Sequence, residues 1–92
     1  MGLPINIQSK TVISLTELKP GQAARICHIP SDTPVGVGLY DRGVAEGQRV
    51  VLERIAPFGS PLWFRFDELP MLLRRDEAAA VRAHYDDERE AK

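Results

Sequence analysis

The chain has a single cysteine, and its 12 Lys and Arg residues nearly balance its 13 Asp and Glu residues. One cysteine cannot form a disulfide within the chain, so a reducing cytoplasm is the expected location. The even charge balance argues against a dedicated nucleic-acid-binding protein, which needs a clustered basic surface. The scarcity of cysteine and the balanced charge therefore favour a cytoplasmic protein with no nucleic-acid partner.

Long apolar runs are also missing. No stretch reaches the roughly 18 apolar residues that a membrane-spanning helix needs, and residues 1–11 lack the charged start and apolar core of a signal peptide. We therefore expect any action at a membrane to depend on a partner. A length of 92 residues predicts one domain.

Three apolar-rich runs dominate the second half of the sequence: Arg49–Ile55, Leu62–Phe66 and Leu69–Leu73. The first two are separated by a Pro- and Gly-containing segment and the last two by Asp67-Glu68. This pattern predicts a three-stranded antiparallel meander. Two acidic residues disfavour a primed two-residue hairpin turn, so we expect either a wider loop or another turn type here.

Alternation along these runs predicts which side chains point inward. A small barrel buries such a face without leaving long open strand edges, so the predicted class is mainly β. Eight apolar side chains are expected in the core: Val50, Leu52, Leu62, Phe64, Phe66, Leu69, Met71 and Leu73.

Short elements are expected around the meander. Ser14 and Glu17 have capping-box spacing and predict one helical turn. Ala23–Ile29 is expected to be a strand, with His28 facing the same side as Ile26 and with Ile29 facing the other. A short helix is expected from Gly38 to Arg42, because Gly36 and Gly38 weaken an earlier start.

A second helix is expected at the C-terminal end of the domain, over residues 75–85. Asp76 and Glu77 suit its first turn, and Ala78, Val81 and Tyr85 recur at helical spacing. These three side chains are expected to dock on the barrel.

Several motifs in this order resemble the FeoA family: Leu15-x-x-Leu18-x-x-Gly21-x-x-Ala24-x-Ile26, Gly43-Val44-x-x-Gly47, Ala56-Pro57-x-Gly59-x-Pro61-Leu62 and Leu73-Arg74-Arg75-x-Glu77-Ala78. The resemblance implies an SH3-like barrel over residues 14–85, with an N-terminal extension at 1–13 and a charged tail at 86–92. It further implies a small interaction protein that binds the cytosolic GTP-binding part of the ferrous iron transporter FeoB and supports or regulates iron uptake.

Candidate partner-binding residues lie on the face opposite the predicted core. Trp63 and Arg65 point outward if Phe64 and Phe66 fill the barrel, and Leu72 faces outward on the next run. Trp and Arg are enriched among residues that dominate binding energies. Leu39 and Arg42 are the candidates for a second contact region.

Catalysis is not expected, and no cofactor is predicted. The sequence shows no nucleophile with a partner base in a recognisable setting, and its carboxylates are not paired in an apolar segment. Cys27 and His28 are good metal ligands, but neighbours on a strand point to opposite faces. His84 with Asp87 or Glu88 has helical ligand spacing, which is common without a bound ion. No metal site is therefore predicted.

Two alternatives stay open beside the FeoA-like interpretation. The same barrel occurs in metal-dependent transcriptional repressors of the diphtheria-toxin-repressor type, so the chain is alternatively a detached regulatory domain. The other alternative is a transition-metal-binding protein that uses Cys27, His28, His84 and the acidic tail. A homo-oligomer, formed through strand edges or the Trp63 face, also stays open.

Overall fold

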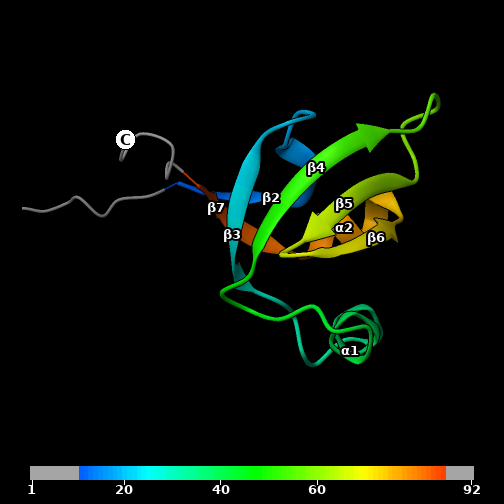
Figure 1. Ribbon diagram of the computed structural model, residues 1–92. Helices are drawn as coiled ribbons and strands as arrows, with labels where there is room; N and C mark the ends of the chain where they lie inside the picture. Colours follow the sequence, from blue (N-terminus) through cyan, green and yellow to red (C-terminus); the bar gives the residue numbers. More distant parts are fainter. Residues whose placement is uncertain (1–10, 87–92) are drawn as a thin grey trace, which may run out of the picture.

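The fold is a strongly curved six-stranded antiparallel sheet (Figure 1) in a computed structural model that describes residues 11–86. The strand order is β2-β7-β3-β4-β5-β6, so β2 and β6 are the edges. The expected mainly β class with short helices is confirmed. The strands are β2 (Val12–Ser14), β3 (Ala23–His28), β4 (Arg49–Ile55), β5 (Leu62–Phe66), β6 (Leu69–Leu73) and β7 (Arg82–Tyr85). The helices are η1 (Leu15–Glu17), α1 (Pro34–Asp41) and α2 (Arg75–Ala80).

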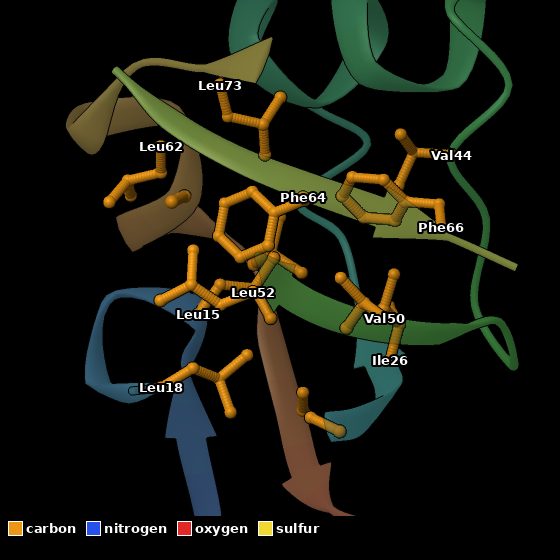
Figure 2. Close-up of a cluster of buried hydrophobic side chains, with 14 of the residues drawn as sticks. Leu15, Leu18, Ile26, Val44, Val50, Leu52, Leu62, Phe64, Phe66 and Leu73 are labelled. Carbon is orange, nitrogen blue, oxygen red and sulfur yellow. The ribbon is translucent and has the colours of Figure 1, made fainter. Parts of the chain in front are cut away.

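The predicted meander is confirmed, and its register aligns the inward side chains. Phe64 of β5 lies opposite Leu52 of β4 and Met71 of β6. Figure 2 shows Phe64 and Phe66 among the aliphatic side chains of the core. The two rings pack with centroids 5.7 Å apart. Both phenylalanines are 1% exposed, so the inner face of β5 is filled with apolar side chains.

The turn between β5 and β6 has only two residues, Asp67 and Glu68, because Phe66 pairs directly with Leu69. Of the two expected alternatives, the wider loop was therefore wrong. Asp67 takes a positive φ of 55°. Its amide donates to the Arg49 carbonyl at 2.8 Å, and its carboxylate accepts from the Arg49 amide at 3.3 Å. These contacts hold a conformation that usually favours Gly or Asn.

The core prediction was wrong in part for β6. Leu73 is fully buried, but Met71 is only half-buried and Leu69 is 45% exposed. Leu69 does share the inward register with Phe66. The strand is at an edge of the sheet, so the side chain at its start lies at the rim of the barrel and is incompletely covered.

The predicted C-terminal helix was wrong beyond Ala80. Helix α2 ends there, and residues 82–85 form strand β7 between β2 and β3. Val81 and Ala83 are buried whereas Arg82 is exposed, which is the alternation of a strand. Strand hydrogen bonding to neighbours on both sides outweighed the helical spacing of Val81 and Tyr85. Helix α2 packs against η1, α1 and β2, which brings it across the opening between the two sheet edges.

The capping box at Ser14 is confirmed. The Ser14 hydroxyl accepts from the Thr16 amide at 3.1 Å, and the Glu17 carboxylate accepts from the Ser14 amide at 3.0 Å. These bonds start the single turn η1, which buries Leu15 completely. Strand β2 precedes it, so Val12 and Ile13 of the expected extension lie in the sheet, paired with β7.

Helix α1 starts four residues earlier than predicted, at Pro34. Thr33 caps it by accepting from the Gly36 amide at 3.0 Å, and Pro34 suits the first helical position. A Cβ at Gly36 would lie 1.8 Å from the Pro30 carbonyl oxygen. Glycine here permits close packing, which outweighs its low helix propensity. Gly43 follows the helix with φ of +98°, which confirms the expected left-handed cap.

Candidate partner-binding surface

The outer face of the meander brings three of the predicted contact residues together. Trp63 and Leu72 are directly paired across β5 and β6, and Arg65 lies two residues along β5, opposite Pro70. Leu72 is 47% exposed, and Trp63 and Arg65 are half-buried. Arg54 of β4 pairs with Trp63 from the other side. We call Arg54, Trp63, Arg65 and Leu72 the Trp63 patch.

Charged groups hold the Trp63 patch in a defined arrangement. The Arg54 guanidinium lies 4.5 Å from the Trp63 ring centroid, which is a cation–π contact. Arg65 Nε donates to Glu53 Oε2 at 2.8 Å, and its Nη1 donates to the Glu68 carbonyl at 3.3 Å. The hydrogen bond to Glu53 raises the pKa of Arg65 further. The patch therefore presents an aromatic ring and an aliphatic side chain between fixed guanidinium groups.

The second predicted region is not part of this patch. Leu39 is fully buried, so its side chain belongs to the core and is not available to a partner. Arg42 caps the C-terminal end of α1, and its Nη2 donates to Glu77 Oε2 of α2 at 2.8 Å. Arg42 thus connects the two helices. Sequence spacing alone did not distinguish the buried side of this helix from its exposed side.

Strand β6 provides the exposed edge next to the patch. It contains Pro70, which has no N–H to donate to an added strand. Such a residue disfavours edge-to-edge pairing. A homo-oligomer through this edge is therefore less favoured than a contact through side chains.

The predicted faces of Cys27 and His28 were partly wrong because β3 contains an irregularity between Ile26 and His28. It leaves both Cys27 and His28 exposed and turns Ile29 into the core. His84 lies on strand β7 rather than on a helix, and Asp87 and Glu88 fall outside the described residues. Within residues 11–86, no group of three or more His, Cys, Asp or Glu side chains is arranged to hold a metal ion.

Two ionisable groups with shifted pKa values lie between β3 and β4. The Glu46 carboxylate accepts a hydrogen bond from the Tyr40 hydroxyl and another from the Ile29 amide at 3.2 Å. The bond from Tyr40 is the main cause that lowers the pKa of Glu46 and, reciprocally, raises the pKa of Tyr40. This contact ties α1 to the segment before β4.

The structure also reveals an exposed residue that sequence reasoning missed. Phe58, in the loop between β4 and β5, is 99% exposed. The only sequence signal is an aromatic residue among Pro, Gly and Ser, where no strand or helix periodicity can bury it.

None of the helices in the described part of the chain is both long and apolar enough to cross a membrane.

The sequence comparisons identify one family. The family model described as "FeoA domain" matches residues 13–84, most of the chain. None of the curated proteins matches this sequence.

Solved structures support the same fold. A FeoA-like protein from Clostridium acetobutylicum is 25% identical, with a TM-score of 0.77 over 84% of this chain and 88% of that chain. FeoA from Stenotrophomonas maltophilia, described as a procaryotic SH3 domain protein and solved with zinc, is 23% identical, with a TM-score of 0.62 over 77% of this chain and 88% of that chain. IdeR from T. acidophilum is 22% identical, with a TM-score of 0.72 over 88% of this chain but only 37% of that chain. The last two likenesses concern the fold alone, and they agree with the expected SH3-like barrel.

Proposed function

Because this chain belongs to the FeoA family, whose members are involved in ferrous iron transport, we propose that it binds the cytosolic GTP-binding part of a FeoB-type transporter. In this proposal it acts in the cytoplasm, reaches the membrane only through that partner, and supports or regulates iron uptake by binding rather than by catalysis. A barrel whose interior is filled with side chains offers little room for a substrate.

The observation that carries the proposal is the Trp63 patch. Trp63 is held between the Arg54 guanidinium and Leu72 on a face that the barrel core does not use. An aromatic side chain with adjacent arginine is the composition typical of residues that dominate protein–protein binding. The cross-strand pairing fixes these side chains before binding, which lowers the entropic cost of association.

The test is an NMR titration of isotopically labelled protein with the cytosolic domain of FeoB from the same organism, with and without GTP and magnesium. We expect amide shifts that cluster on Trp63, Arg65 and Leu72. Trp63→Ala is expected to weaken binding at least tenfold, as for a binding hot spot. Val37→Ala is the matched control, because Val37 is 50% exposed on α1, outside the patch. Equal affinity of the Trp63→Ala variant and the wild type would contradict the proposed surface.

A second candidate is a detached regulatory barrel, since the fold also matches part of IdeR. It predicts binding to a helix-turn-helix repressor instead of to the transporter. The same labelled protein titrated with such a repressor, encoded nearby in the genome, separates the two functions. Shifts with the repressor and none with the transporter domain would favour this candidate.

A further inference from the structure

The loop between β4 and β5 presents an aromatic side chain that has no role in the fold. Phe58 is 99% exposed, far more than any other large apolar residue of residues 11–86. An isolated exposed apolar residue is common on protein surfaces. Two further features distinguish Phe58: hydrogen bonds hold the backbone of its loop, and the loop projects from the end of the β4–β5 ladder at which Trp63 lies.

The loop is held by hydrogen bonds that do not involve the Phe58 ring. The Ala56 amide donates to the Pro61 carbonyl at 3.1 Å, and the Gly59 amide donates to the Ala56 carbonyl at 2.8 Å. From outside the loop, Arg75 Nε donates to the Gly59 carbonyl at 2.9 Å, and the Arg75 amide donates to the Ser60 hydroxyl at 3.2 Å. The start of α2 thus fixes the loop, and Figure 1 shows it projecting beyond the ends of β4 and β5. The backbone that carries the exposed ring is therefore held in place.

The loop begins one residue pair beyond the Arg54–Trp63 pair of the β4–β5 ladder. Ile55 and Leu62 form the last pair of the β4–β5 ladder, and Arg54 and Trp63 form the pair before it. Ile55 shares the inner side of the ladder with its partner Leu62, so it is not part of the Trp63 patch. The loop nevertheless projects from the end of the β4–β5 ladder at which Arg54 and Trp63 lie, so one partner can contact both the loop and the Trp63 patch.

The charges around this loop have one predominant sign. Residues 55–61 carry no charge, and the guanidinium groups of Arg54 and Arg75 lie on either side of the loop. The nearby carboxylates of Glu53 and Glu77 are paired with Arg65 and Arg42, and Asp76 stays charged next to Arg75 in the sequence. A complementary surface is apolar at its centre and acidic at its rim.

We propose that Phe58 is the anchor of the partner contact and inserts into an apolar pocket edged by carboxylates on the partner protein. This inference rests on the proposed function, since it takes the partner to be the transporter's cytosolic domain. A membrane surface fits less well, because one aromatic ring and two arginines fall short of the two strong signals that stable lipid attachment needs. A few residues, often aromatic, carry most of the binding energy of a protein interface, and Phe58 is proposed as one of them beside Trp63.

The experiment measures the affinity of the full chain for the FeoB cytosolic domain by calorimetry. Phe58→Ala is expected to weaken binding at least thirtyfold, the effect of a strong hot spot, whereas Phe58→Leu, which keeps an apolar side chain, is expected to lose less than tenfold. Because Phe58 is fully exposed, neither variant should alter the fold, and an unchanged melting temperature checks this. Wild-type affinity is expected to fall as NaCl is raised from about 50 to 200 mM, because an acidic rim is screened.

The outcomes separate the inference from the proposed function. If Trp63→Ala weakens binding but Phe58→Ala does not, the anchor is overturned while the function stands. If the wild-type protein does not bind the FeoB cytosolic domain, both the inference and the proposed function are overturned. Affinity independent of salt overturns the acidic rim. A lipid surface replaces the protein pocket if two results occur together. The wild type, but not Phe58→Ala, sediments with vesicles of phosphatidylcholine and phosphatidylserine, and Phe58→Ala leaves the affinity for the FeoB cytosolic domain unchanged.

Discussion

The two faces of strand β5 differ sharply although they are built from adjacent residues. On the inner face, Leu62, Phe64 and Phe66 are each 1% exposed. On the outer face, Trp63 and Arg65 are half-buried, and their contacts are a guanidinium over a ring and an ion pair with Glu53. The inner face is explained entirely by the fold. The outer face places a large aromatic residue outside the core, which is why we propose that it also binds a partner.

The largest effect is expected from Phe64→Ala on the inner face. Removal of a fully buried ring leaves a cavity and is expected to lower the free energy of unfolding by about 3–5 kcal/mol. Urea denaturation measures the change. Phe58→Ala makes the same chemical change at a 99% exposed position and is expected to cost less than about 0.5 kcal/mol. Similar losses in the two variants would contradict the assignment of one ring to folding and the other to binding.

A smaller effect is expected from Trp63→Ala on the outer face. The variant loses the contact with Arg54 and the cross-strand pair with Leu72, which together are expected to contribute about 1–2 kcal/mol to folding. A double-mutant cycle with Arg54→Ala isolates the cation–π term, expected to be about 0.5–1 kcal/mol. A coupling of zero would show that the stacked arrangement does not hold the ring.

The smallest effect is expected for a surface hydrogen bond outside the sheet. Tyr40→Phe removes the bond to Glu46 and is expected to raise the pKa of Glu46 toward its ordinary value. A carboxylate whose pKa is lowered by folding stabilises the protein above its unfolded pKa, and this contribution is lost as the pH falls through the folded value. The variant should therefore lose less stability on acidification than the wild type. NMR titration of the Glu46 side chain measures the pKa, and an unchanged value would contradict the role of Tyr40.

Local pattern was sufficient to predict the meander and the capping box. Strands β4, β5 and β6 have the predicted bounds because alternating apolar residues between turn residues specify a strand with one buried face. The alternation also placed Trp63, Arg65 and Leu72 on one surface before any contact was known. Ser14 and Glu17 specified a helical turn because both partners of the capping box lie within four residues.

Other features depend on contacts between distant segments. Residues 82–85 form a strand because they hydrogen-bond to β2 on one side and to β3 on the other. The spacing of Val81 and Tyr85 alone also fits a helix. Helix α1 keeps Gly36 because the Pro30 carbonyl packs against it. Leu39 is buried because its side chain joins the core cluster and helix α2 packs against α1. None of these neighbours can be identified from local sequence.

The sequence by itself determined the fold class, the inward and outward faces of the meander, and the resemblance to the FeoA family, because these follow from local periodicity and from motifs in order. Only the tertiary structure decided that Leu39 belongs to the core, that Arg42 connects two helices, and that Phe58 stands exposed on a hydrogen-bonded loop. The exposure of a side chain depends on what the rest of the chain packs against it, and Arg75, which holds this loop, lies 16 residues away from Gly59 in the sequence.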